Sequence, residues 1–326
     1  MAGSPSDSGV ANYGAQVVSA IEATDLTKRY GDTLAVDALS VAIPEGAIYG
    51  FLGPNGAGKT TTMRMLTGLL RPTSGTATVG GAPVSDRDSL RTRIGYLPEE
   101  PPLYEEVTAI EQLEYVAGLR DLRAKESRER IDRLLTRLDL AGDATTRISE
   151  FSKGMRQKTA FVQAVLHDPD VLFLDEPTSG LDPRAARTLR ATITELASGG
   201  TTVFLSTHIL PVVDELADTV GVLYNGRLVA EGPTEELKGH AETGDRRSLE
   251  EAFLELTDDG DPLAGRTNAG GGIEASGGAD AEANGGTEAS TDAGTAAGDG
   301  RNADGESDRG TERETNGETE PEPTDG

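Results

Sequence analysis

The sequence of 326 residues contains no cysteine. Disulfides, thiolate metal sites and cysteine nucleophiles are therefore excluded. No apolar run approaches the roughly 20 residues that a membrane-spanning helix needs. The N-terminus lacks the basic start and apolar core of a signal peptide. We therefore expect a cytoplasmic protein that reaches a membrane only through a partner.

Positive charge is scarce, with 30 Lys and Arg against 56 Asp and Glu, giving a net charge of -26. A chain this acidic is a poor match for nucleic acid as its main partner. Dense carboxylates stay hydrated at high salt, where their mutual repulsion is screened. The composition thus fits a salt-loving source, although it says nothing about activity.

The hydrophobic fraction of 36% is low for a fully packed chain of this size. Residues 1–18 are rich in Gly, Ser and Ala. From Asp261 to the end there are 16 acidic residues against 4 Arg, and no aromatic residue. Such a segment cannot bury enough apolar surface to offset its ordering entropy. We expect a disordered N-terminus (1–18), a folded domain (19–256) and a disordered acidic tail (257–326). The tail is either merely solvated or a regulatory, partner-binding segment.

Between these ends, short apolar runs alternate with longer helical periods, which predicts an α/β domain with a largely parallel sheet. Ile48–Leu52, Val171–Leu174 and Thr202–Leu205 are continuous apolar runs, as strands buried on both faces should be. Val220–Val229 contains Asn225-Gly226 between apolar stretches, a strong hairpin signal.

Two helical segments stand out. One begins near Asp182, a good N-cap, with Pro183 at its first position. The block from Thr108 to Leu140 has apolar residues at helical spacing and is expected to be helical throughout. We interpret this block as part of a helical subdomain, about residues 100–155, inserted into the α/β core.

The first chemical motif matches G-x-x-x-x-G-K-[ST] in full, between a predicted strand and a predicted helix. Its glycines let successive N–H groups point at phosphate oxygens, and the helix adds its positive end. Lys59 supplies a cation to the β- and γ-phosphates, and Thr60 offers a hydroxyl to Mg²⁺. The predicted ATP-binding residues here are Gly53, Pro54, Asn55, Gly56, Ala57, Gly58, Lys59, Thr60 and Thr61.

The second motif is the apolar strand that ends in Asp175-Glu176. Ligands in open α/β sheets lie at the carboxyl ends of the strands. Asp175 can hold Mg²⁺ there, usually through water, and Glu176 is placed to polarise a water that attacks the γ-phosphate. Together the two motifs predict a nucleoside triphosphatase, but kinases, helicases, GTPases and transport ATPases all share them.

Further motifs discriminate among these classes. They occur at Lys28-Arg29-Tyr30-Gly31, Tyr96-Leu97-Pro98-Glu99, Phe151-Ser152-Lys153-Gly154-Met155, Ser179-Gly180-Leu181-Asp182 and Ser206-Thr207-His208. With these, residues 21–256 resemble the ATP-binding cassette subunits of ABC transporters. The resemblance implies a P-loop α/β core, an inserted helical subdomain and an antiparallel β subdomain.

The resemblance also implies roles for single residues. Tyr30 would stack on adenine, although a half-buried Tyr at a strand end is the structural alternative. Glu99 occupies the position of the family's usual Gln, which contacts Mg²⁺ and the attacking water. A carboxylate can still ligate Mg²⁺ there, but it adds negative charge near the γ-phosphate. Glu99 is thus a predicted metal ligand and catalytic residue, typical of the exporter branch.

Ser152 and Gly154 match the signature usually written L-S-G-G-Q, and the resemblance implies that they bind the γ-phosphate held by an opposite subunit. The alternative for Ser152 is a simple helix N-cap. Residues 179–182 resemble the family's dimer-contact loop. His208 would contact the γ-phosphate, whereas His167 and His240 are expected to be plain surface residues.

The implied machine is a homodimer or heterodimer of cassettes, closed by Mg-ATP and docked on integral membrane permease subunits at the cytoplasmic face of the membrane. The block from Glu99 to about Ser149 is where those subunits would dock. The motif variants favour export. The alternatives are a soluble ABC ATPase that acts on ribosomes or DNA, and a P-loop phosphotransferase.

Overall fold

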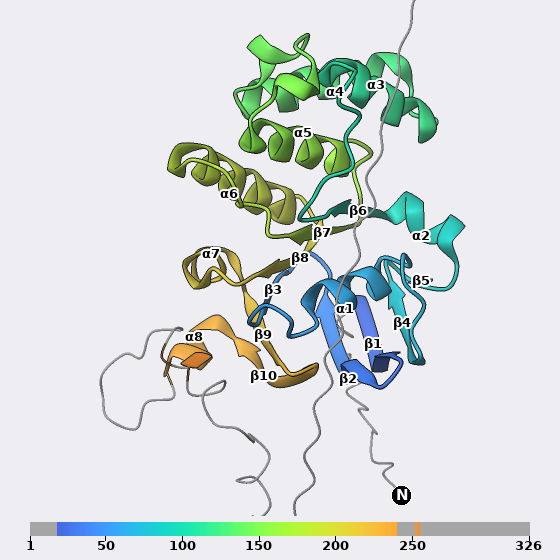
Figure 1. Cartoon of the computed structure of the whole chain (residues 1–326), viewed down its shortest axis with the longest axis vertical. Coiled ribbons are helices and arrows are strands. Elements are labelled where there is room, and N and C mark those ends of the chain that lie inside the picture. The colour runs from blue at the N-terminus through green and yellow to red at the C-terminus, as the bar shows by residue number, and fades with distance from the viewer. Residues whose placement is uncertain (1–17, 240–250, 252, 255–326) are drawn as a thin grey trace, which may run out of the picture. The chain divides into compact units, whose positions relative to one another are not determined.

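The computed structural model describes residues 18–239, 251, 253 and 254 (Figure 1). The acidic tail, His240 and all of the N-terminal segment except Val18 lie outside the described residues. The predicted disorder of both ends and the predicted domain boundaries therefore stay predictions.

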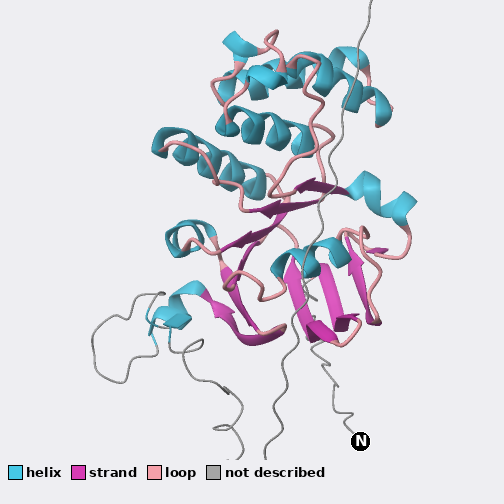
Figure 2. Ribbon diagram, viewed as in Figure 1, coloured by secondary structure: helices cyan, strands magenta, loops and turns pink. Residues whose placement is uncertain are grey.

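A six-stranded sheet forms the centre of the domain, and all its pairings are parallel except that of β10 with β9 (Figure 2). Its central strands are buried along their whole length, which explains their continuous apolar sequences. In spatial order the strands are β10 (Arg227–Pro233), β9 (Thr219–Tyr224), β3 (Ile48–Leu52), β8 (Thr202–Thr207), β7 (Val171–Asp175) and β6 (Ile94–Leu97). The predicted parallel core is confirmed.

The predicted hairpin joins β9 to β10. Asn225 and Gly226 have φ values of 48° and 79°, and a two-residue turn with both values positive matches the twist of the flanking strands. A second sheet is antiparallel and confirms the implied β subdomain. In spatial order it contains β2 (Thr33–Pro44), β1 (Ser19–Tyr30), β4 (Ser74–Val79) and β5 (Ala82–Pro83).

Helices follow most of the strands, and those within residues 109–165 gather beyond the β6 edge of the parallel sheet in Figure 1. The helices are α1 (Lys59–Leu66), α2 (Arg87–Arg93), α3 (Ala109–Leu119), α4 (Ala124–Arg137), α5 (Lys153–Val165), α6 (Pro183–Ser198), α7 (Leu210–Leu216) and α8 (Thr234–Gly239), with short 3₁₀ turns at η1 (Ala141–Asp143) and η2 (Ile148–Glu150). The predicted start of α6 is confirmed, because Asp182 Oδ1 accepts from the backbone N–H groups of Arg184 and Ala185, both at 2.9 Å.

The prediction of unbroken helix from Thr108 to Leu140 is wrong at two points, because α4 ends at Arg137 and the chain also breaks before α4. The chain leaves the helical path between α3 and α4, where Asp121 has a φ of 54°. The N–H of Leu122 bonds back to Ala117 O at 3.0 Å, which closes the end of α3. The spacing of apolar residues does not reveal this turn, because the helical spacing continues on both sides of the break.

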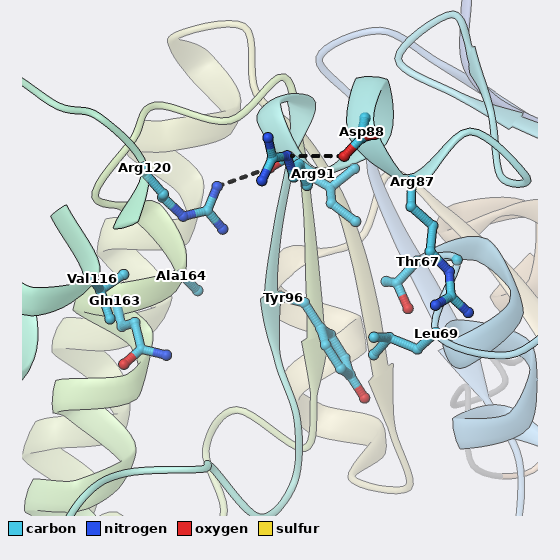
Figure 3. A pocket seen from close by; sticks show the side chains of 12 residues that line it. Thr67, Leu69, Arg87, Asp88, Arg91, Tyr96, Val116, Arg120, Gln163 and Ala164 are labelled. Carbon is cyan, nitrogen blue, oxygen red and sulfur yellow. Dashed lines mark hydrogen bonds and ion pairs between the residues drawn. The ribbon is translucent and has the colours of Figure 1, made fainter. Parts of the chain in front are cut away.

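A cavity of about 330 Å³ opens between the end of α1, α2, β6, α3 and α5 (Figure 3). Its apolar lining includes Leu69 and Val116. On its rim, Arg120 Nη1 donates to Arg91 O at 2.8 Å, and Arg91 pairs with the exposed Asp88 at 3.6 Å. Partial burial lowers the pKa of Arg120, and the neighbouring Arg91 lowers it further. The cavity thus combines an apolar lining with crowded positive charge.

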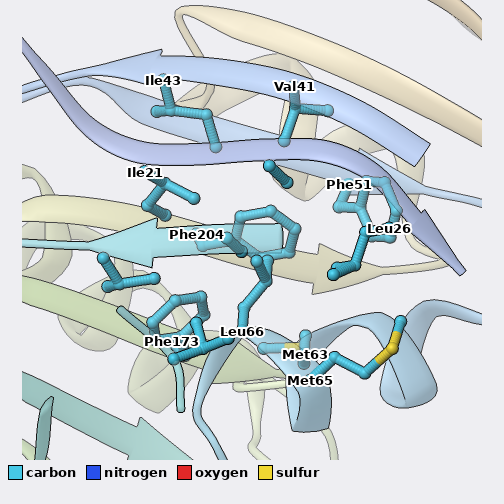
Figure 4. Close-up of a cluster of buried hydrophobic side chains, with 14 of the residues drawn as sticks. Ile21, Leu26, Val41, Ile43, Phe51, Met63, Met65, Leu66, Phe173 and Phe204 are labelled. Atoms are coloured by element: carbon cyan, nitrogen blue, oxygen red, sulfur yellow. The ribbon is translucent and has the colours of Figure 1, made fainter. Parts of the chain in front are cut away.

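The hydrophobic core covers both faces of the parallel sheet. On one face, Phe51, Phe173 and Phe204 pack with α1 and the antiparallel sheet, as Figure 4 shows. On the other face, apolar side chains of α3, α4, α5 and α6 pack against Leu172 and Leu205. The helical region therefore shares most of its core with the sheet and keeps only a small cluster of its own at Ala109, Ile148 and Phe151. This packing fixes the carboxyl ends of β3, β7 and β8 at one edge.

The expectation that His167 is a plain surface residue is wrong. Its Nε2 lies 2.9 Å from Ile94 O, so this nitrogen carries the proton, and its Nδ1 is buried with no hydrogen-bond partner in the described part of the chain. Burial, followed by repulsion from Arg120, lowers the pKa of His167 to about 4.

This lowered pKa predicts acid sensitivity. An unfolded His titrates near ~6.5, so between that pH and about 4 the unfolded chain binds more protons, and stability falls as pH drops through this window. We expect urea unfolding to show that the drop in unfolding free energy from pH 7 to pH 5 is smaller in His167→Gln by about 1–2 kcal/mol. Equal drops in both proteins would contradict this assignment.

In the part of the chain that the structure describes, every helix is too short or too polar to cross a membrane.

Candidate functional site

The phosphate-binding motif lies between β3 and α1, as predicted. The Lys59 side chain is 7% exposed and folds back over the loop, where its Nζ donates to Gly53 O at 2.7 Å and to Pro54 O at 3.2 Å. Burial lowers the pKa of Lys59, while Glu176, Asp175 and Glu99 oppose that shift. The amine is therefore held at the loop, beside three carboxylates.

Two glycines of this loop are required by close contacts with other strands. Gly58 has a φ of 109°, and a Cβ placed on it would lie 2.4 Å from Ala35 O. A Cβ on Gly53 would lie 2.5 Å from Leu223 O. Because any side chain at either position would collide with backbone, the loop needs glycine there for shape alone.

Asp175 ends β7 directly beside the loop, where its Oδ2 accepts from Thr60 Oγ1 at 3.0 Å. The residue is 1% exposed, and Oδ1 is buried without a hydrogen-bond partner in the described structure. Burial is the main cause that raises the pKa of Asp175. A carboxylate with one oxygen unused, next to a hydroxyl, suits a hard cation such as Mg²⁺.

Glu176 follows in a strained conformation, with a φ of 48° and 6% exposure. The end of β8 holds its carboxylate: Oε2 accepts from Thr207 Oγ1 at 2.8 Å, and Oε1 accepts from the His208 N–H at 3.0 Å. His208 Nδ1 lies 2.7 Å from the same Oε1. The predicted pair Glu176 and His208 is thus brought into direct contact.

One cavity of about 360 Å³ collects most of the predicted site. Its lining residues are Ala35, Asn55, Gly56, Gly58, Lys59, Thr60, Thr61, Glu99, Asp175, Glu176 and His208. Within the described residues, no three Asp, Glu or His side chains are arranged to hold a metal ion by themselves. A cation in this cavity would need further ligands, and substrate phosphates are the usual source for Mg²⁺.

Six predicted residues do not line this cavity: Gly53, Pro54 and Ala57 of the loop, and Tyr30, Ser152 and Gly154 outside it. Tyr30, 49% exposed, ends β1 with Lys28 Nζ 5.2 Å from its ring centroid. Ser152 is exposed and caps α5, because its Oγ accepts from the Met155 N–H at 3.2 Å. The capping alternative for Ser152 is therefore present. Gly154 follows in the first turn of α5.

The signature segment instead contacts residues 179–182. A Cβ on Gly154 would lie 3.0 Å from Gly180 O, and Lys153 Nζ donates to Ser179 Oγ at 3.0 Å. The buried Gln157 places its Nε2 3.4 Å from Glu176 O. The helix that begins at the signature thereby reaches the backbone of Glu176.

Gln157 and Thr207 both contact Glu176, although neither has a role predicted from the sequence. The contact of Thr207 follows from the strand pairing. Asp175 lies opposite Ser206, so the next residues, Glu176 and Thr207, lie close together. Gln157 could not be found in this way, because its contact depends on how α5 packs against β7.

Three comparisons place this geometry among known proteins. The family model described as ABC transporter matches residues 36–179. The chain is 43% identical over 230 residues to the daunorubicin resistance ATP-binding protein DrrA3 of Streptomyces coeruleorubidus, covering 70% of this chain and 72% of that protein. It is 41% identical to the bacitracin transport ATP-binding protein BcrA of Bacillus licheniformis, covering 67% and 71%. A solved ATP-binding subunit of an ABC transporter superposes with a TM-score of 0.68 at 34% identity, covering 72% of this chain and 98% of that structure.

Proposed function

The chain belongs to the ATP-binding subunits of ABC transporters, and from this premise we propose that it drives export by membrane-spanning partner subunits. As an ABC ATPase it couples ATP hydrolysis to transport. Export is supported by its relatives, whose names refer to drug resistance and bacitracin transport. The observation that carries the proposal is one cavity that joins Lys59, Asp175 and Glu176 while Ser152 lies outside it. The salt-loving source stays a prediction.

In this proposal the triphosphate lies along the loop from Gly53 to Thr60, with Lys59 leaving its carbonyl partners for the β- and γ-phosphates. Thr60 and Asp175 would hold Mg²⁺, and Glu99, which lines the same cavity, would be a further ligand. When bound, Mg²⁺ neutralises the charge that develops on the phosphate oxygens. The free Oδ1 of Asp175 supports this assignment.

Glu176 is the general base that takes a proton from the attacking water. Its strained backbone and its two fixed oxygens keep the carboxylate in place before substrate arrives. His208 touches Glu176 through both its backbone and its ring, so its position follows that of the base. A γ-phosphate bound by His208 would therefore be oriented relative to Glu176.

Two copies complete each site. Ser152 is exposed at the start of α5 and does not line the cavity that contains Lys59, so its side chain is accessible to the γ-phosphate held by a second subunit. ATP then joins the two surfaces, and its hydrolysis lets them separate. This is a population shift in which nucleotide binds the closed dimer better than the open one.

The permease subunits dock at the helical region. The cavity between α2, α3 and α5 offers an apolar lining, and the half-buried Arg120 on its rim faces another arginine. Within the described residues, Arg120 has no carboxylate in salt-bridge distance, so an acidic side chain from the partner would relieve this charge.

Arg120→Glu tests the docking site. We expect the variant to hydrolyse ATP at the basal rate of the wild type while losing most of its recovery with membranes, because the reversed charge would repel the partner's acid. Lys125→Glu, on the exposed start of α4, makes the same charge change away from the cavity lining and should have no effect. Recovery of the Arg120 variant at the wild-type level would contradict docking here.

The experiment that tests the function itself is purification of the full chain from native membranes, with identification of what is recovered with it. A multi-span protein without an ATP-binding motif is the expected partner. Ribosomes or DNA-repair proteins in its place would favour the soluble ABC ATPase and overturn the proposal.

A further inference from the structure

The phosphate loop is enclosed from two sides by strands of different sheets. On one side, the Gly226 N–H in the β9–β10 turn donates to Ala57 O at 3.0 Å. On the other side, Ala35 of β2 leaves no room for a side chain on Gly58. The loop therefore lies between β2 and the β9–β10 turn.

An ion pair joins these two sides, and we name Asp37 and Arg227 the Asp37–Arg227 clasp. Arg227 Nε donates to Asp37 Oδ2 at 2.7 Å, and Arg227 Nη2 lies 2.6 Å from the same oxygen. The backbone adds a bond from the Asp37 N–H to Gly226 O at 2.8 Å. The Asp37 side chain is only 23% exposed, so solvent screens this pair less than a fully exposed one.

The clasp connects the antiparallel sheet to the strand pair that contacts the phosphate loop. In that sheet, β2 forms a hairpin with β1, and Thr33 pairs with Tyr30 at its end. Any shift of β2 relative to the β9–β10 turn therefore moves Tyr30 relative to the phosphate loop. A ligand that stacks on Tyr30 and places its phosphates on the loop depends on that separation.

We propose that the Asp37–Arg227 clasp is a positioning pair that fixes where the adenosine end of ATP binds. The proposal rests on the proposed function, since it needs ATP in this site and adenine on Tyr30. Neither Asp37 nor Arg227 lines the cavity, so both act through β2 on Tyr30 and not on the nucleotide itself.

The test compares two ligands that share their phosphates. In the full chain, Asp37→Asn and Arg227→Gln should each weaken ATP binding about fivefold, as expected for coupling through a partly exposed pair. Binding of inorganic tripolyphosphate, measured by competition, should stay within about twofold, because the loop keeps its own contacts. The double variant should lose no more ATP affinity than either single variant, since each substitution breaks the same interaction.

Four further variants complete the design. Glu215→Gln breaks the Arg190–Glu215 pair, 2.9 Å long and partly exposed, and should leave both affinities unchanged. Tyr30→Ala should weaken ATP binding, and adding Asp37→Asn should cost little more. The reversed pair Asp37→Arg with Arg227→Asp should recover ATP affinity.

Two results would overturn the proposal: wild-type ATP affinity in both single variants, or an equal loss for ATP and tripolyphosphate, which would place the effect at the loop. A wild-type protein that binds no ATP would instead overturn the proposed function. Thermal unfolding of each variant shows whether any loss of affinity reflects loss of the fold.

Discussion

Glu176→Gln should lower the rate of ATP hydrolysis by about 100- to 10,000-fold, the range that a positioned general base contributes. The amide keeps the shape of the side chain but cannot take a proton from water. It can also keep both contacts, with its oxygen accepting from the His208 N–H and its NH₂ group donating to Thr207 Oγ1. Binding of ATP should therefore survive, and the closed dimer should accumulate.

Two measurements check this expectation: single-turnover phosphate release, and the molecular mass in solution with Mg-ATP. Glu99→Gln is the matched control, because it removes the same charge from the same cavity. It should raise the Mg²⁺ concentration needed for half-maximal hydrolysis while costing far less in the maximal rate. A Glu176 variant that stays monomeric with ATP, or that hydrolyses within tenfold of the wild type, would contradict the assigned mechanism.

The folding of the nucleotide loop could be predicted from local sequence because its causes are local. A glycine-rich turn between an apolar strand and a helix can adopt few conformations, and the full motif fixes which side chains face the phosphates. The same holds for the Asn225-Gly226 turn and the Asp182 cap, where one or two residues determine the geometry.

Contacts between distant elements could not be predicted in this way. The turn at Asp121 is the exception, a local feature that was missed because the apolar period continues across it. The burial of His167 depends on β6 packing against the end of α5. The clasp joins positions 190 residues apart, and nothing in the neighbourhood of Asp37 or Arg227 reveals it.

The same distinction between local and distant causes applies to the residues of the site. Motif spacing predicted which residues would gather, and the cavity brings together Lys59, Asp175, Glu176 and His208. Motif spacing did not predict the contacts that orient each side chain, such as the hydrogen bond from the Thr207 hydroxyl to the Glu176 carboxylate. The roles of Tyr30, Ser152 and Gly154 need a nucleotide and a second subunit, and they stay predictions.

Lys59→Ala should abolish tight ATP binding. The amine already lies at the loop, and in the complex it would give charge-assisted hydrogen bonds to two phosphates. Each such bond contributes about 1.5–3 kcal/mol, so losing both weakens ATP binding by at least about 100-fold. Dimer formation with ATP should be lost as well, because in the proposed mechanism ATP joins the two subunits.

Calorimetric titration with Mg-ATP and light scattering check this prediction, and Lys125→Ala, an exposed lysine on α4, controls for the loss of one charge. Burial lowers the pKa of Lys59, so holding this charge costs the folded protein free energy, and removing it should not lower the melting temperature. A Lys59→Ala protein with a lower melting temperature than the wild type would show that Lys59 stabilises the loop through its hydrogen bonds to Gly53 and Pro54. One that keeps its melting temperature but still dimerises with ATP would show that the triphosphate binds without the amine, and the proposed site would be wrong.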